Sequence, residues 1–77
     1  MICKFNNLIE LVNISRFATL SLPNSDINIS SGTICLDAKS IVGISSLDLS
    51  KEYNVEIITH DEDEKEKFYS YFEQYKL

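Results

Sequence analysis

Residues 37–50 read Asp37-Ala38-Lys39-Ser40-Ile41-Val42-Gly43-Ile44-Ser45-Ser46-Leu47-Asp48-Leu49-Ser50, and the rest of the chain is organised around them. A polar start leads into a short apolar run that one glycine interrupts. Serine is a preferred N-cap because its hydroxyl accepts a backbone N–H that the helix leaves unpaired, so Ser40 marks a helix start. Ile41, Ile44 and Leu47 are three residues apart and define one helical face. We therefore predict a helix from Ser40 to Leu47.

Four short runs of residues have the pattern of β-strands. Ile2–Phe5, Asp26–Ser30 and Thr33–Asp37 alternate apolar and polar side chains, as half-buried strands do, and Val55–Thr59 is rich in branched apolar residues. Gly32 follows two serines between the second and third runs and can adopt a positive φ. These two runs are therefore predicted to form a β-hairpin.

The N-terminal third of the chain predicts a helix from Asn7 to Leu20. Either Asn6 or Asn7 can serve as its N-cap, and Glu10 is the capping-box partner of Asn7. Pro23 lies beyond the helix end, as is common, because proline cannot continue a helix. Apolar and small residues recur at helical spacing, namely Leu8, Leu11, Val12, Ser15 and either Ala18 or Thr19, with Ile14 and Phe17 widening the stripe.

A last helix is predicted from Asp61 to about Lys76. Asp61 is suited to the N-cap, with Glu64 as its capping-box partner. Acidic residues in the first helical turn are favoured by the helix dipole, so the charged run 61–67 is interpreted as a solvated helix start. The buried face of this helix is expected to consist of aromatic residues: Phe68, Tyr71, Phe72 and Tyr75.

The predicted order of elements is β-α-β-β-α-β-α within one domain, residues 1–77. Strands and helices mix without a regular βαβ alternation, which favours an α+β fold with an antiparallel sheet and helices on one face. A chain of 77 residues has room for one hydrophobic core.

Composition and charge exclude several classes of function. The net charge of −5 argues against binding nucleic acid or an anionic membrane surface, since either partner requires a basic face. No apolar run approaches the ~18 residues that span a bilayer, and the N-terminus does not have the pattern of a signal peptide. We therefore expect a cytoplasmic protein without a bound metal or other cofactor. Cys3 and Cys35 are then expected to be free thiols, buried on strands.

The segment Lys39-Ser40-Ile41-Val42-Gly43, followed by Ser46-Leu47, resembles the regulatory-serine segment of the HPr family. These proteins are small phosphocarriers of the bacterial sugar phosphotransferase system. A looser similarity extends from about Asp26 to Ile58. The resemblance implies an open-faced sandwich, with strand order 1-4-2-3 and three helices on one face of the sheet. In that order the first and third strands are the two edges, which keeps Cys3 and Cys35 too far apart for a disulfide.

Phosphoryl carriage in this family depends on a histidine at the start of the first helix, within a His-Ala-Arg-Pro-like motif. This histidine accepts the phosphoryl group from Enzyme I. The chain contains one histidine, His60. Two alignments of this chain with the family are possible. An alignment that runs through the first helix without gaps places Ile9 at the position of the carrier histidine. An alignment that matches residues 15–20 to the residues after the histidine in the motif places Ile14 there. The acidic residues after His60 would repel a phosphate. The resemblance is therefore to a divergent family member that lacks the phosphocarrier histidine.

The resemblance assigns a regulatory role to Ser40. In many family members the matching serine is phosphorylated by HPr kinase, and the modified protein binds a transcriptional regulator. Lys39, Ile41, Val42 and Leu47 are the expected partner-docking residues around it, although helix capping and core packing alone also explain residues of these types. We hypothesise a non-catalytic regulatory or binding module. The alternatives are a working phosphocarrier with a displaced acceptor and a protein of the same fold with an unrelated interaction role.

Overall fold

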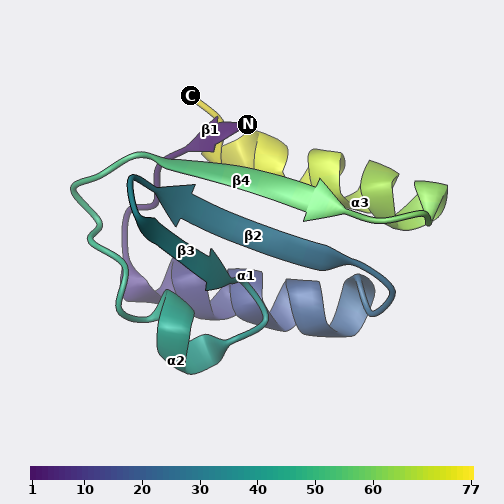
Figure 1. The fold of residues 1–77 in the computed structure, drawn as a ribbon, viewed down its shortest axis with the longest axis horizontal. Coiled ribbons are helices and arrows are strands. Elements are labelled where there is room, and N and C mark those ends of the chain that lie inside the picture. Colours follow the sequence, from purple (N-terminus) through teal and green to yellow (C-terminus); the bar gives the residue numbers. More distant parts are fainter.

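Four strands form one antiparallel sheet in the order β1-β4-β2-β3 in the computed structural model, which describes residues 1–77. The strands are β1 (Ile2–Cys3), β2 (Asp26–Ser31), β3 (Ile34–Asp37) and β4 (Tyr53–Ile58). Figure 1 shows β2 and β4 side by side at the centre of the sheet and β3 beyond β2. The strand order that the resemblance implies is therefore confirmed, as is the hairpin, in which Gly32 has a φ of 59°.

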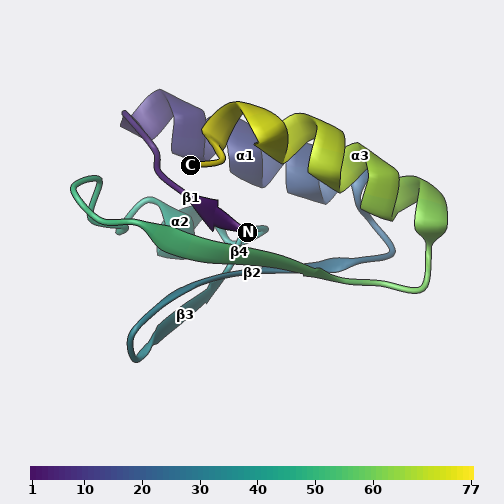
Figure 2. The ribbon, with the colours of Figure 1, turned by 90° about the horizontal axis from the view of Figure 1, so that it is seen from above.

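The helices are α1 (Leu8–Ser21), α2 (Ile41–Ile44) and α3 (Glu62–Phe72), and a 3₁₀ turn, η1 (Glu73–Tyr75), follows α3. Figure 2 shows α1 and α3 above one face of the sheet, and α2 packs against α1 near β3. The predicted α+β fold, with its order β-α-β-β-α-β-α, is present. No helix combines the length and apolar character needed to cross a membrane.

Local hydrogen bonds explain why some elements are shorter than predicted. Helix α2 ends at Ile44 instead of Leu47, because the backbone N–H groups of Ser46 and Leu47 bond to the carbonyls three residues earlier, Gly43 and Ile44, instead of four. The Ser45 and Ser46 hydroxyls also donate to the carbonyls of Ile41 and Gly43, both at 2.6 Å. The final helix tightens into a 3₁₀ turn after Phe72.

The start of α1 is fixed by its cap. Asn7 is the N-cap, and its side chain accepts a hydrogen bond from the backbone N–H of Glu10 at 2.9 Å. The Glu10 carboxylate accepts a hydrogen bond from the backbone N–H of Asn6 at 2.7 Å. Asn6 lies one residue before Asn7, the predicted capping-box partner of Glu10. The buried stripe of the helix begins one turn later, so the expectation that Leu8 is buried is wrong; the buried residues are Leu11, Ile14, Ser15 and Ala18.

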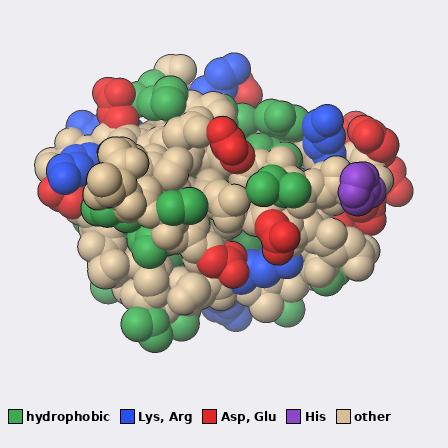
Figure 3. All heavy atoms as spheres, in the orientation of Figure 1, with side chains coloured by type: hydrophobic (Ala, Val, Ile, Leu, Met, Phe, Trp, Pro, Cys, Tyr) green, Lys and Arg blue, Asp and Glu red, His purple; other side chains and the backbone are tan.

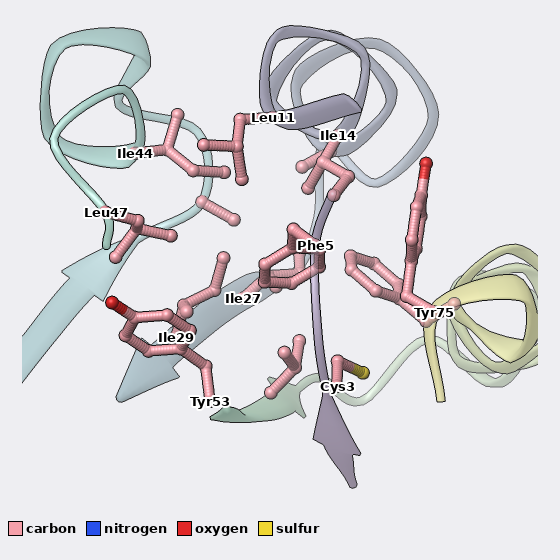
Figure 4. Packing of buried hydrophobic residues seen from close by; sticks show 14 of the residues in the cluster. Cys3, Phe5, Leu11, Ile14, Ile27, Ile29, Ile44, Leu47, Tyr53 and Tyr75 are labelled. Carbon is pink, nitrogen blue, oxygen red and sulfur yellow. The ribbon is translucent and has the colours of Figure 1, made fainter. Parts of the chain in front are cut away.

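The hydrophobic core lies between the sheet and the helices. Figure 4 shows Phe5 at its centre, among side chains from both layers. Its ring packs edge-on against Tyr75, with the ring centroids 5.5 Å apart, and stacks more loosely on Tyr53 at 6.4 Å. The Tyr53 hydroxyl accepts from the backbone N–H of Asp48 at 2.9 Å, which ties the segment after α2 to β4.

The two cysteines lie on opposite edge strands and are both free thiols. Cys3 is buried, as expected, but the expectation that Cys35 is buried is wrong. Cys35 pairs with Ser30 on the sheet face that the helices leave uncovered, because it alternates with Leu36, which packs on the core.

We expect a maleimide to modify one thiol per native molecule and two per unfolded molecule. Cys35 is exposed, whereas burial raises the pKa of the Cys3 thiol and denies the reagent access. Intact-protein mass spectrometry after timed labelling measures the stoichiometry. The variant Cys35→Ser should remain unlabelled until it is unfolded, and rapid labelling of that native variant would contradict the burial of Cys3.

Candidate functional site

Ser40 is exposed between β3 and α2 and is the N-cap of α2. Its backbone is extended, with φ −87° and ψ 102°, and its Oγ accepts a hydrogen bond from the backbone N–H of Gly43 at 3.3 Å. A Cβ at position 43 would lie 3.3 Å from this Oγ, so glycine leaves room for the hydroxyl. The predicted cap is confirmed, and its oxygen lies at the surface.

The segment that precedes Ser40 is held by the sheet. Ala38 is buried and donates its backbone N–H to the carbonyl of Ile27 at 2.9 Å. Asp37 accepts twice, from the backbone N–H of Lys39 at its carboxylate (2.9 Å) and from that of Ser40 at its carbonyl (3.0 Å). These bonds present Ser40 in a defined position.

The Lys39 ammonium is committed to a structural contact. Its Nζ donates to the backbone carbonyl of Ser25 at 2.5 Å and so links this segment to the loop between α1 and β2. Lys39 is half-buried. Its charge therefore lies toward α1, where it lines a groove with Ile41.

The apolar residues expected to dock a partner differ in exposure. Val42 is 82% exposed and Ile41 is also exposed. Leu47 is 8% exposed and belongs to the core, so its assignment to a docking surface is corrected. The cause is the early end of α2, after which the chain turns Leu47 inward beside Ile44, as Figure 4 shows.

Helix α1 supplies residues that the sequence analysis did not assign to this site. A groove of about 400 Å³ lies between α1 and α2, lined by Ser15, Arg16, Thr19, Leu20, Lys39 and Ile41. Leu20 is one of the most exposed large apolar side chains. Only the packing of α2 on α1 brings Arg16 and Leu20 close to the segment around Ser40, and no local pattern signals it.

The two alternative carrier positions differ in exposure. Ile9 is 70% exposed in the first turn of α1, whereas Ile14 is completely buried. His60 lies at the other end of the molecule, before α3, in a depression that it lines with Asn24, Asp61, Glu62 and Asp63. Figure 3 shows the histidine (purple) next to carboxylates (red) at that end. His60 is therefore remote from the first turn of α1 and from Ser40. No group of three metal-ligating side chains is present.

A second polar cluster ties α3 to the loop between α1 and β2. Glu64 is only 4% exposed, so its predicted place in a solvated helix start is wrong. Its carboxylate accepts from the Asn24 backbone N–H at 3.0 Å, from Asn24 Nδ2 at 2.9 Å and from Ser25 Oγ at 2.7 Å. The predicted capping-box bond is thus replaced by contacts to residues about 40 positions earlier.

Asp61 caps α3 as predicted. Its carboxylate accepts from the backbone N–H groups of Asp63 at 3.0 Å and Glu64 at 3.1 Å. The bond from Glu64, with further bonds from Asn24 and Asp63, lowers the pKa of Asp61 below its ordinary value. Since Asn24 bonds to both carboxylates, the capped helix end and the loop form one connected network.

Comparison with known proteins gives one match. The family model described as "PTS HPr component phosphorylation site" matches residues 13–70, which is most of the chain. The matched range includes Ser40 with its neighbours and Ile14, and it begins after Ile9. Searches of curated proteins and of solved structures found no significant match.

Proposed function

The chain belongs to the HPr family, whose members are phosphocarrier-like proteins related to the sugar phosphotransferase system, and on this premise we propose that it is a non-catalytic regulatory or binding module. The observation that carries the proposal is the exposed Ser40 hydroxyl, held on a fixed backbone beside exposed apolar side chains. Isoleucine at both alternative carrier positions supports the non-catalytic part, because an alkyl side chain has no lone pair with which to accept a phosphoryl group.

Phosphorylation of Ser40 is the proposed form of regulation. A phosphate adds a charge of about −1.5 to −2 at pH 7 and strong acceptor oxygens. At the N-cap these oxygens can accept the Gly43 N–H in place of the hydroxyl, so the fold tolerates the modification. Its main consequence is an anion beside Ile41 and Val42, which changes the partners that can dock there.

The proposed docking surface combines predicted residues with residues from α1. Exposed Ile41, Val42 and Leu20 form its apolar part, with Arg16 and Lys39 along the groove between the helices. Neighbouring exposed apolar side chains bordered by polar groups are typical of protein-binding surfaces. We propose protein partners in the cytoplasm, of the type represented by HPr kinase or a transcriptional regulator.

Incubation with HPr kinase and ATP tests this function. We expect a single phosphate on Ser40, no labelling of Ser40→Ala, and a free energy of unfolding about 1 kcal/mol lower for that variant, because the cap is lost. Ser40→Asp should restore the cap while remaining unlabelled. Phosphopeptide mapping and denaturant unfolding provide the two measurements.

Ser46→Ala is the matched control, since Ser46 is also exposed but donates its hydroxyl to a backbone carbonyl. This variant should be labelled like the wild type. If HPr kinase still phosphorylates Ser40→Ala, or does not phosphorylate the wild-type protein, the regulatory role of Ser40 is contradicted and the residue is a helix cap alone.

A further inference from the structure

One buried polar side chain of α1 is left without a partner. Ser15 is only 3% exposed, yet its hydroxyl takes part in none of the hydrogen bonds of the chain, not even one to the carbonyl of Leu11 four residues earlier. Every side-chain oxygen or nitrogen that is completely enclosed has a partner, so the Ser15 oxygen must retain contact with open space. Ser15 lines the groove between α1 and α2, and its free hydroxyl therefore opens into that groove.

The groove lies where α2 packs beside α1, as Figure 1 shows. Ser15 and Thr19 are four residues apart, which places both hydroxyls along one side of α1. The space of about 400 Å³ is referred to below as the α1–α2 groove, and two hydroxyl, two cationic and two apolar side chains line it: Ser15, Thr19, Arg16, Lys39, Leu20 and Ile41.

The α1–α2 groove is a positively charged site on an acidic protein. The chain has a net charge of −5 and a single arginine, Arg16, which lines the groove together with Lys39. No acidic residue lines it. Asp37 is near in sequence, but it pairs with Asn28 on the sheet face that the helices leave uncovered, so its carboxylate lies on the other side of the sheet.

Most hydrogen-bond donors of the groove are free. The Arg16 guanidinium is exposed and carries five N–H donors, none of which bonds within the chain. The Lys39 ammonium donates one of its three N–H groups to the Ser25 carbonyl, which leaves two. Thr19 is exposed, and its hydroxyl is also unbonded. The groove therefore offers several donors without an ionised acceptor, which is the combination that binds an oxyanion.

We propose that the α1–α2 groove binds a small phosphate monoester. Its phosphate lies between Arg16 and Lys39, where the Ser15 hydroxyl can donate to it. Its organic part packs against Leu20, which is 75% exposed, and Ile41, which is 44% exposed. Binding requires no phosphate on a side chain of the protein itself, so this site goes beyond the regulatory function proposed above and does not depend on it.

Charge and size favour a phosphate monoester over other anions. A monoester carries a charge of about −1.5 to −2 at pH 7 and three terminal acceptor oxygens, which matches two cations and two hydroxyls. A carboxylate has one charge and two oxygens and would leave donors of the groove unused. The volume is at the small end of the ~300–1,000 Å³ that is typical of ligand pockets, so the organic part must be small.

Titration of isotope-labelled protein with phenyl phosphate, followed by NMR, tests the site. The amide signals of Ser15, Arg16, Thr19, Lys39 and Ile41 should shift and saturate, with a dissociation constant of about 1 mM or lower. Absence of saturable shifts at these residues overturns the proposal.

Three further compounds test the class of ligand. Phenol has the ring without a charge, benzoate has the ring with one charge, and inorganic phosphate lacks the ring. Each should bind at least about fivefold more weakly than phenyl phosphate. Phenol or benzoate of equal affinity would overturn the assignment to a phosphate, with benzoate pointing to an acidic side chain of a partner protein as the occupant. Inorganic phosphate of equal affinity would overturn the contribution of the apolar side chains.

Two substitutions locate the phosphate within the groove. Arg16→Gln should weaken binding of phenyl phosphate about tenfold, because a charge-assisted pair is lost. Ser15→Ala should weaken it about threefold, since one donor is lost. The Ser15 hydroxyl has no partner in the free protein and alanine favours a helix, so the midpoint of thermal unfolding of Ser15→Ala should equal or exceed that of the wild type. Unchanged affinity, or a lower midpoint that reveals a partner for the hydroxyl, would overturn the role of Ser15.

Lys65→Gln is the matched charge control, because Lys65 is an exposed cation on α3 that does not line the groove. It should bind phenyl phosphate like the wild type, and a loss equal to that of Arg16→Gln would show non-specific attraction and overturn the site. Ser40→Ala should also bind like the wild type. Failure of Ser40 phosphorylation and failure of ligand binding are therefore observed separately.

Discussion

Replacement of Glu64 by alanine is expected to lower the free energy of unfolding by about 3 kcal/mol, the largest effect on stability among the substitutions considered. The carboxylate is buried and accepts hydrogen bonds from the backbone and side chain of Asn24 and from Ser25. A hydrogen bond to a charged group contributes about 1.5–3 kcal/mol, and water can replace only part of the three lost here, since Ser25 is buried although Asn24 is exposed. Ser25 loses least, because its hydroxyl also lies 2.7 Å from that of Thr59. A domain of this size has a total stability near the lower end of 5–15 kcal/mol, so the loss would be severe.

Two matched substitutions isolate the role of the carboxylate. Glu66→Ala removes an exposed carboxylate from the same helix and should change stability by less than about 0.5 kcal/mol. Glu64→Gln keeps a carbonyl acceptor of the same size and should fall between Glu64→Ala and the wild type. Urea unfolding measures all three. If Glu64→Ala were as stable as Glu66→Ala, the contact between α3 and the loop before β2 would make no net contribution to the free energy of unfolding.

The elements that the sequence predicts correctly are those specified by near neighbours. The alternation around Ile27 and Ile29 identifies β2, and Gly32 marks the turn after it. Asn7, Ser40 and Asp61 each cap the helix that follows, because a cap depends on residues two or three positions away. The strand order is not contained in such local patterns and followed from the family resemblance.

The incorrect predictions concern side chains whose surroundings come from distant parts of the chain. Glu64 has the local sequence of a solvated helix start, and only Asn24 and Ser25 explain its burial. Leu47 was expected on α2, but the helix ends at Ile44 and the side chain packs in the core with residues of the sheet, among them Ile29 and Tyr53. Arg16 and Leu20 likewise join the site around Ser40 through the packing of α2 on α1. A capping or strand pattern cannot report these contacts.

Enzyme I and phosphoenolpyruvate are expected to transfer no phosphoryl group to this protein, whereas an HPr that has the carrier histidine is labelled fully in the same assay. A transferable phosphoryl group requires a nucleophile whose phosphorylated form is itself reactive, which a neutral imidazole provides. Neither Ile9 nor Ile14 has such a group, and His60 is at the opposite end of the molecule with Asp61 and Glu62 beside it. Acid-labile phosphate on the wild-type protein would contradict this prediction, and its loss in His60→Asn would identify a displaced acceptor.

Histidine substitutions at the two alternative carrier positions should have opposite outcomes. Ile14 is completely buried, so Ile14→His places a polar ring in the core and should cost about 3 kcal/mol of stability without creating an accessible acceptor. Ile9 is exposed in the first turn of α1, so Ile9→His should fold like the wild type and present its imidazole near the positive end of the helix dipole. We expect acid-labile labelling on Ile9→His and none on Ile14→His. If both variants remain unlabelled, a missing nitrogen at the start of α1 is not the only reason for the absence of labelling, and the surface that meets Enzyme I must differ as well.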